Sequence, residues 1–194
     1  VTMRDSFMDC PDRERAQWWG DVTSEMFMTM YSMDSNSYLL YQKGVEAMLS
    51  HIDDTKVLQT VVPINGDYFE LPVQQLAGIV GFLTYYEYTG DKAFIEKVYD
   101  ASLDYLKLWE IGENNLVVHR GGSWDWADWG SKADMIAIEN AWVYHALSAA
   151  EKMAEILGRD GDIPFITERK ETIAKGYRSL WTDEGFRSGD VRNP

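Results

Sequence analysis

Apolar residues recur at helical spacing in six long segments of the chain, and glycines, prolines and aspartates separate these segments. The first segment is typical, because Val22, Met26, Met30 and Met33 fall on one face of a helix that starts at Trp19. The sequence therefore predicts a helical protein, with helices over residues 19–33, 35–51, 71–89, 91–110, 134–157 and 162–181.

Charged residues alternate between these segments. After Asp21, the first segment has a single charge, Glu25. The third has none over residues 71–86, and the fifth has only Glu139 over residues 135–150. The second, fourth and sixth segments each carry a polar face. A ring of buried inner helices, wrapped by amphipathic outer helices, requires this alternation.

The six helices pair into three αα-hairpins, which predicts an all-α fold in which the hairpins form an open arc of a toroid. Residues 57–64 form a β-like run, and residues 114–120 are a candidate β-hairpin insertion. In an open arc the charge-poor helices keep one face without a partner, so another chain or further residues of this chain are expected to cover it. A closed bundle of six helices is the alternative architecture.

Composition narrows the candidate partners. The net charge of −14 repels phosphate backbones and anionic membrane surfaces, so we predict no nucleic-acid partner and no membrane partner. The longest apolar run, residues 76–83, is also too short for a membrane-spanning helix, which needs about 20 residues. A neutral ligand fits better, and the aromatic content of 13% supplies flat faces for stacking on one. The compartment is not distinguished by the sequence.

The single cysteine, Cys10, excludes an internal disulfide. His51, His119 and His145 lack the close spacing of a zinc motif, so we predict no metal and no cofactor. The first residues, VTMRDSF, do not resemble a signal peptide and do not begin with Met. We therefore expect residues 1–194 to form a single partial domain, a fragment of a longer chain.

The segment from Asp9 to Asp21, DCPDRERAQWWGD, combines four acids with the adjacent tryptophans Trp18 and Trp19. It precedes the first charge-poor helix, as residues 67–70 precede the third and WDWADWG, residues 124–130, precedes the fifth. In a ring of hairpins these three loops converge at one end. Carboxylates that accept paired hydroxyl hydrogen bonds, and indoles that pack on the apolar face of a pyranose, predict a carbohydrate cleft there.

Glu14 is the candidate general acid for hydrolysis of a glycosidic bond, which needs one protonated and one ionised carboxyl group. Neighbouring acids and Trp18 would raise its pKa, whereas Arg13, Arg15 and the nearby helix terminus would lower it. From the sequence alone the direction stays open. The alternative for the whole segment is a helix cap with a solvated ion-pair cluster.

The other two loops have alternatives of their own. Trp124, Trp126 and Trp129 either bind sugar or plug the end of the barrel, while Asp125 and Asp128 either bind sugar or cap the next helix. Glu70 is a weaker candidate, because an acid is also an ordinary residue in the first turn of a helix. The methionines of the first helix are interpreted as core filling. They are Met26, Met28, Met30 and Met33.

The segment DCPDRERAQWWGD resembles the signature of glycoside hydrolase family 78, the α-L-rhamnosidases. The matching features are an Asp before Cys-Pro, at Asp9, a Glu after the arginine-containing stretch, at Glu14, and a Trp-x-Gly-Asp ending over residues 18–21. A later Asp-Trp element of the family is similar to residues 125–126 or to residues 128–129, and the choice stays open. Ala16-Gln17 departs from the Leu-Gly of many members.

The resemblance implies that Glu14 is the general acid of an inverting enzyme that removes terminal α-L-rhamnose, that Asp9 and Asp21 bind rhamnose hydroxyls, and that Trp18 packs on the sugar. It also implies an (α/α)6 barrel, of which three hairpins are about half. The general base of the family would then lie beyond Pro194, in the missing half of the barrel, and the isolated fragment is expected to be inactive.

Two alternatives to this function remain. Related helical barrels act on other sugars, so the chain could belong to a different glycosidase. It could also be a non-catalytic carbohydrate-binding or scaffold domain, which would bind sugar without turnover.

Overall fold

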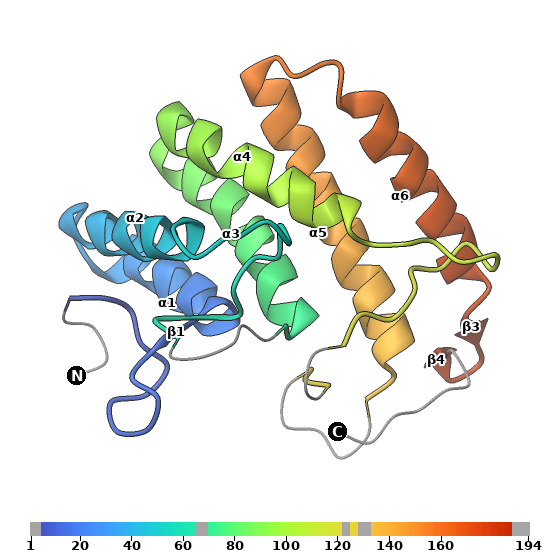
Figure 1. Cartoon of the computed structure of the whole chain (residues 1–194), viewed down its shortest axis with the longest axis horizontal. Helices are drawn as coiled ribbons and strands as arrows, with labels where there is room; N and C mark the ends of the chain where they lie inside the picture. Colours follow the sequence, from blue (N-terminus) through green and yellow to red (C-terminus); the bar gives the residue numbers. More distant parts are fainter. Residues whose placement is uncertain (1–4, 65–69, 122–124, 128–132, 188–194) are drawn as a thin grey trace.

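A computed structural model describes residues 5–64, 70–121, 125–127 and 133–187. Within these residues the chain forms six long helices and four very short strands (Figure 1). The helices are α1 (Trp19–Ser32), α2 (Asn36–Leu49), α3 (Pro72–Thr89), α4 (Lys92–Lys107), α5 (Met135–Leu157) and α6 (Ile163–Arg178). Every predicted helix is present, with ends that differ from the prediction by no more than a turn.

The helix ends follow the residues that separate the segments. Gly90 and Gly158 end α3 and α5 in the left-handed conformation, with φ of 68° and 71°. Asp91 and Asp134 then cap α4 and α5, because their side chains accept hydrogen bonds from the backbone N–H groups three residues later. These caps fix the length of each hairpin.

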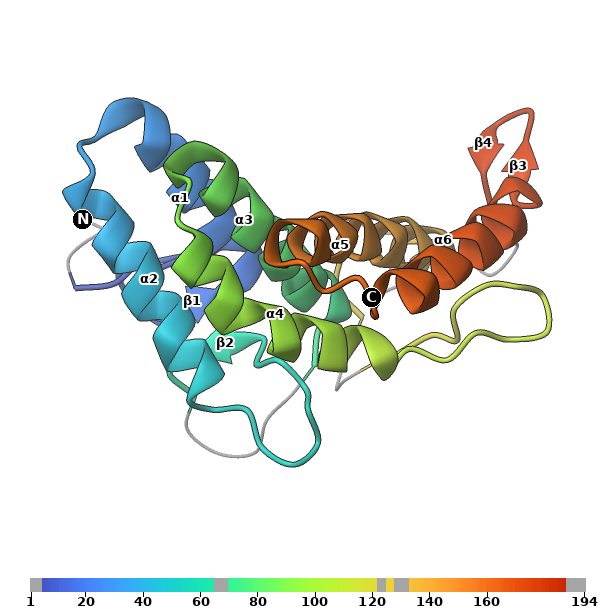
Figure 2. The same cartoon turned by 90° about the horizontal axis from the view of Figure 1, so that it is seen from above.

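The charge-poor helices lie side by side. α3 packs between α1 and α5, while α2 and α4 lie along one side of this row and α6 packs on α5 (Figure 2). α3 is buried over most of its surface, and α4 buries one apolar stripe while its charged face is exposed. The prediction of an all-α array of three hairpins with inner and outer helices is confirmed, and the array is an open arc.

The core is centred on aromatic side chains where α2, α3 and α4 meet. Tyr85 of α3 stacks on Tyr41 of α2 at a centroid distance of 5.2 Å, and it contacts Phe94 of α4 at 4.4 Å. Phe82 lies edge-on to both Phe94 and Trp19. These contacts join α1, α2, α3 and α4, the four helices of the first two hairpins.

Some residues predicted as core are exposed. Met28 and Met33, which were expected to fill the core, and Leu39, on the apolar side predicted for the second helix, have exposed fractions of 59%, 53% and 62%, whereas Met26 is fully buried. The prediction was wrong for these three because helical spacing indicates a face but not what covers it. On α1, Phe27 and Tyr31 are exposed as well, and the exposed Tyr88 of α3 lies edge-on to both, so the three rings form an exposed aromatic cluster.

The short strands differ from the prediction. Residues 114–120 contain only an isolated bridge, from Ile111 to Val117, instead of a hairpin. A hairpin forms instead after α6, where β3 (Trp181–Thr182) pairs with β4 (Gly185–Phe186), although the sixth helix was expected to reach Trp181. Gly185, with φ of 115°, permits this turn.

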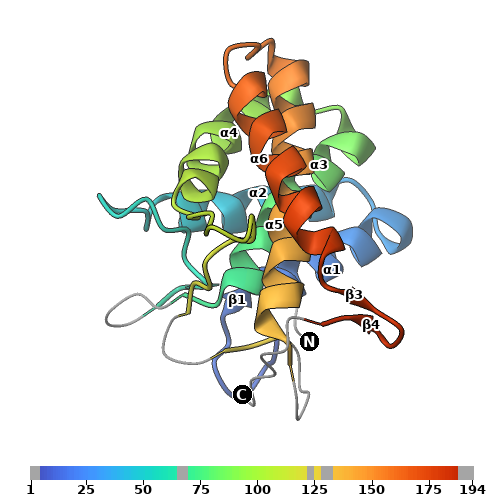
Figure 3. The same ribbon diagram turned by 90° about the vertical axis from the view of Figure 1, so that its right-hand side faces the viewer.

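The predicted β-like run is partly confirmed, and it positions the site. Its residues Val61–Val62 form β2, which pairs antiparallel with β1 (Gln17–Trp18). The starts of α1, α3 and α5 lie along the lower side of the molecule in Figure 1, and the loops before α1 and α5 gather there in Figure 3. Among the described helices, none combines the length and apolarity needed to cross a bilayer.

Candidate active site

The two adjacent tryptophans lie in different environments. The pairing of Trp18 with Val61 and of Gln17 with Val62 fixes this part of the chain immediately before α1. Trp19 is fully buried, with its ring 6.3 Å from that of Phe82. Trp18 is half-buried and lines a cleft. Trp18 is the last residue of β1 and Trp19 is the first residue of α1, and the change from strand to helix directs one tryptophan to the cleft and the other to the core.

The first turn of α1 is tied to α3 by hydrogen bonds. The backbone N–H of Gly20 donates to Oε1 of the buried Gln74, and the Thr23 hydroxyl donates to the carbonyl of Ala77 at 3.4 Å. A Cβ atom at position 20 would lie 2.9 Å from that Gln74 oxygen, so any larger residue here would displace the Gln74 side chain from this hydrogen bond. This contact sets the position of the neighbouring Asp21.

The cleft has a volume of about 870 Å³ and collects residues from two of the three predicted loops. Asp9, Glu14, Trp18 and Asp21 come from the first loop, and Trp126 comes from the loop before α5. Residues of α1, α3 and α5 and of the segments that precede these helices complete the lining. These are Arg13, Gly20, Thr23, Ser24, Leu71, Val73, Gln74, Ala77, Val80, Ala127, Ile138 and Trp142.

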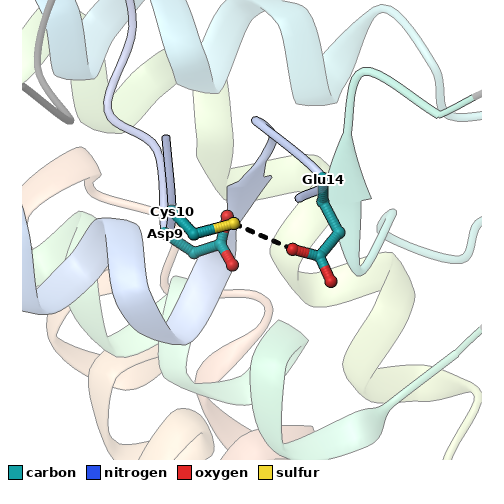
Figure 4. Close-up of side chains that lie close together, drawn as sticks. All are labelled: Asp9, Cys10 and Glu14. Carbon is teal, nitrogen blue, oxygen red and sulfur yellow. Dashed lines mark hydrogen bonds between the residues drawn. The ribbon is translucent and has the colours of Figure 1, made fainter. Parts of the chain in front are cut away.

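The carboxylate of Glu14 is held by the only thiol of the chain (Figure 4). Cys10 Sγ donates to Glu14 Oε2 at 2.9 Å, and Arg13 Nε lies 3.5 Å from the same oxygen. The thiol hydrogen bond, more than any other contact, lowers the pKa of Glu14, and the backbone N–H and Arg13 act in the same direction. With 39% of the side chain exposed, desolvation opposes this only in part. The pKa of Glu14 is therefore lowered in this structure, whereas the sequence alone left the direction of the shift open.

Asp9 is more enclosed than Glu14. Its side chain is 11% exposed, with Oδ2 3.8 Å from Arg13 Nη2, and its backbone N–H donates to the carbonyl of Ala16 at 3.2 Å. Its Oδ1 is buried and has no hydrogen-bond partner within the described residues. Asp21 is exposed at the first turn of α1. Both residues line the cleft, where a carboxylate can accept a hydrogen bond from a ligand hydroxyl.

Glu25 was not predicted as a site residue. It lies one turn after Asp21 on α1 and is half-buried, with Oε2 lacking a hydrogen-bond partner among the described residues. Burial, followed by repulsion from Asp21 and Asp9, raises the pKa of Glu25 to about 7. The signal in the sequence was its position as the only charge in an otherwise uncharged stretch of helix.

Asp9, Cys10 and Glu14 offer three ligand atoms within 4.8 Å of one another, as a divalent metal would require. A metal-bound cysteine must be a thiolate, whereas the Cys10 thiol uses its proton in the bond to Glu14. The described geometry therefore suits a hydrogen-bonded pair better than a metal site.

Within the loop before α5, the described residues are 125–127. Asp125 Oδ1 lies 3.0 Å from His119 Nε2, and His119 Nδ1 lies 3.0 Å from the carboxylate of Glu139. Trp126, the next residue, lines the cleft. The predicted sites at Trp124, Asp128 and Trp129 lie outside the described residues.

The alternative in which the loop acids cap the next helix is wrong for Asp125, because Asp134 caps α5. His119 and Glu139 were not predicted as partners of this loop. No sequence pattern pairs them, because they meet only through the packing of α5.

Glu70 is part of an internal ion pair. Its buried carboxylate accepts two bonds from the Arg120 guanidinium, at 2.9 and 2.8 Å, and one from the Tyr105 hydroxyl at 2.8 Å. The Arg120 side chain also lies over the ring of Trp109. The sequence-based suggestion that Glu70 contacts a ligand therefore gives way to a structural role that anchors the start of α3.

Comparison with known proteins shows where this arrangement recurs. Residues 1–192 match the family described as the bacterial alpha-L-rhamnosidase six-hairpin glycosidase domain. The fold is similar to a family 78 rhamnosidase of Bacillus sp. GL1, with a TM-score of 0.82 and 21% identity, over 94% of this chain and 19% of that one. No curated protein matches the chain.

A second similar structure is a rhamnosidase from Klebsiella oxytoca with rhamnose bound, at a TM-score of 0.82 and 17% identity. The match covers 94% of this chain and 36% of that one. The chain therefore spans well under half the length of the solved structures that it resembles.

Proposed function

Because the chain belongs to the bacterial α-L-rhamnosidase six-hairpin glycosidase domain family, we propose that the protein containing it is an inverting glycoside hydrolase that removes terminal α-L-rhamnose from glycosides or polysaccharides. The observation that carries this proposal is the cleft in which Asp9, Glu14, Trp18 and Asp21 meet Trp126. Trp126 lies more than a hundred positions after the other four residues in the sequence, and the hairpin array brings it to the same end of the molecule.

In this proposal Glu14 is the general acid that protonates the departing oxygen. Asp9 and Asp21 accept hydrogen bonds from rhamnose hydroxyls, which suits the free Oδ1 of Asp9. Trp18 packs on the apolar face of the sugar, and Trp126 offers a second indole in the same cleft. The resemblance to family 78 gives these roles, and the shared cleft supports them.

A general acid must be protonated when the substrate is bound, whereas the thiol of Cys10 favours the ionised form of Glu14. Glu14 is accessible to solvent in this structure, so a bound sugar would remove water from its carboxyl group. Desolvation raises the pKa of a carboxylic acid, which would oppose the effect of the thiol. We propose that occupancy of the cleft makes Glu14 competent as an acid.

Inversion needs a second carboxyl group, about 6.5–9.5 Å from the acid, to activate water. Asp9, Glu14 and Asp21 already have roles in this proposal, as sugar-binding residues and general acid, so none of them serves as the base. We propose that the general base comes from residues outside this chain, in a second half of the barrel. The exposed aromatic cluster of Phe27, Tyr31 and Tyr88 would pack against that half.

The test uses the full-length protein with two substrates, an alkyl and an aryl α-L-rhamnoside. The alkoxide leaving group of the alkyl substrate needs a proton from the general acid, whereas the activated phenol of the aryl substrate departs with little acid assistance. On an alkyl α-L-rhamnoside, we expect Glu14→Gln to lower kcat by about 100-fold or more, and on an activated aryl leaving group by much less. Proton NMR of the first product formed should show the inverted anomer. Glu96→Gln, an exposed site on α4, is the control.

Wild-type turnover of rhamnosides establishes the activity, and unchanged alkyl-rhamnoside turnover in Glu14→Gln would refute the role of Glu14. If a panel of other aryl glycosides is cleaved and the rhamnoside is not, the sugar assignment is wrong.

The lowered pKa of Glu14 favours a second candidate, a carbohydrate-binding domain without catalysis. An ionised carboxylate binds hydroxyls well but cannot donate a proton. Saturable binding of L-rhamnose, measured by calorimetry, with no hydrolysis of any glycoside would support this alternative.

A further inference from the structure

His119 bridges two carboxylates beside the cleft. Its Nε2 lies 3.0 Å from Asp125 Oδ1, and its Nδ1 lies 3.0 Å from both oxygens of Glu139. The side chains of His119 and Asp125 are 16% and 19% exposed, while that of Glu139 is completely buried. Three ionisable groups from two elements therefore form one continuous array between the loop and α5.

The array needs two protons to make both of its hydrogen bonds. Ionised carboxylates only accept, so either the ring carries a proton on each nitrogen, or one of the two carboxyl groups is protonated and donates to the ring nitrogen that faces it. Burial is the main reason that the pKa of Glu139 is raised to about 7, and His119 opposes that effect. In each arrangement a hydrogen bond joins Nε2 to Asp125, so the bond to the loop is retained.

The backbone on either side of His119 is fixed. The N–H of Val117 donates to Oδ1 of Asn140 on α5 at 2.8 Å, and Arg120 holds Glu70 through two bonds. A Cβ atom at Gly121 would lie 3.1 Å from His119 Nε2, so glycine leaves room for the ring to reach Asp125. Hydrogen bonds at Val117 and Arg120 therefore hold the backbone that carries the His119 imidazole.

The far end of the array leads directly to the cleft. Asp125 precedes Trp126, and Glu139 follows Ile138, and both Trp126 and Ile138 line the cleft. His119 itself does not line it. Its contacts join the loop that carries the indole to the helix that forms the adjacent wall.

We propose that His119 is a positioning residue, which holds the segment 125–127 against α5 and thereby fixes the Trp126 indole in the wall of the cleft. The effect on the sugar rests on the proposed function, whereas the effect on Trp126 does not. His119 acts through Asp125, and the buried Glu139 orients the ring from behind.

The first experiment observes Trp126 without a sugar. The full-length protein is labelled with 5-fluorotryptophan, and the fluorine resonance of Trp126 is assigned from its loss in Trp126→Phe. We expect His119→Ala to shift or broaden this resonance and to leave that of the core residue Trp19 unchanged. His51→Ala, an exposed histidine at the end of α2, is the control and should change neither.

His119→Ala leaves Glu139 buried without its imidazole and is a demanding variant for folding. Asp125→Ala breaks the same link from the loop side, at a partly exposed residue, and should perturb the Trp126 resonance in the same way. An unchanged Trp126 resonance in either folded variant overturns the proposal.

The second experiment is a double-mutant cycle on sugar affinity. We expect His119→Ala and Trp126→Ala each to weaken L-rhamnose binding about tenfold, which is about 1.4 kcal/mol. The double variant should bind as weakly as Trp126→Ala alone, because the histidine then has no indole to position. Additive effects would contradict the proposal. If the wild type binds no rhamnose, the proposed function fails, while the fluorine experiment still decides the role of His119.

Discussion

Glu25 allows a quantitative test of how burial and the neighbouring acids Asp21 and Asp9 raise the pKa of a carboxyl group on α1. It lies half-buried on α1, next to Asp21 and Asp9, and its carboxyl group has a pKa of about 7 in place of 4.5. Glu25→Gln keeps the shape of the side chain and removes its charge. The variant therefore isolates the free-energy cost of ionising this position in the folded protein.

The sign follows from comparing the two states. An acid whose pKa is higher in the folded state binds its proton more tightly there, so its contribution to stability is complete below pH 4.5 and is lost as pH rises to 7. A change from 4.5 to about 7 corresponds to roughly 3 kcal/mol at full effect. Glu25 is only half-buried, and solvent screening reduces this to about 1–2 kcal/mol.

At pH 8 we expect Glu25→Gln to be more stable than the wild type by about 1–2 kcal/mol, which raises the unfolding midpoint by roughly 2–8 °C. At pH 4 the two proteins should unfold at the same temperature, because Glu25 is then protonated in both states. Calorimetric scans at pH 4, 5, 6, 7 and 8 measure the difference. Glu96→Gln, the same change at an exposed position of α4, is the matched control.

The reasoning is refuted if the stability difference between Glu25→Gln and the wild type does not change between pH 4 and 8. It is also refuted if the variant is less stable than the wild type at pH 8. A pH-dependent gain of the same size in Glu96→Gln would show that the effect comes from the overall negative charge and not from the surroundings of Glu25.

Two further predictions concern hydrogen bonds that the structure defines. Cys10→Ala removes the donor that lowers the pKa of Glu14, so the alkaline limb of the pH–rate profile of the full-length enzyme should move to higher pH, while Cys10→Ser, which keeps a donor, should restore it. An unmoved limb in Cys10→Ala contradicts this. Arg120→Met leaves Glu70 charged and buried and should destabilise the protein by about 3 kcal/mol in urea unfolding. Lys97→Met removes an exposed ion pair and should cost less than about 1 kcal/mol, so equal losses would refute the distinction.

The sequence predicted the helices well, because their signals are local and repeated. Long uncharged runs at α3 and α5 can be stable only when buried, and the Gly-Asp pair at Gly90 sets a helix end and the next cap. The exposure of Met28 and Leu39 was not predictable in this way, since spacing along one helix does not say which other element covers a face.

The sequence predicted which segment forms the site but not how its side chains are arranged. Acids and indoles concentrated between Asp9 and Asp21 identified where the cleft would lie, yet the different surroundings of Trp18 and Trp19 depend on pairing with β2. His119 and Glu139 are 20 residues apart and meet only in the folded protein. Contacts of this kind depend on tertiary packing and leave no periodic pattern in the chain.

The pairing of β1 with β2 also links ligand affinity to local unfolding. One short strand presents Trp18 to the cleft and leads into Trp19, whose backbone N–H donates to the carbonyl of Thr60 at 3.3 Å. If β1 separated from β2, Trp18 would leave the cleft and Trp19 would leave the core together, because they are consecutive residues. A sugar bound on Trp18 would therefore slow hydrogen exchange at the Trp19 amide, and the occupied cleft would be coupled to the cooperative unit that closes the core.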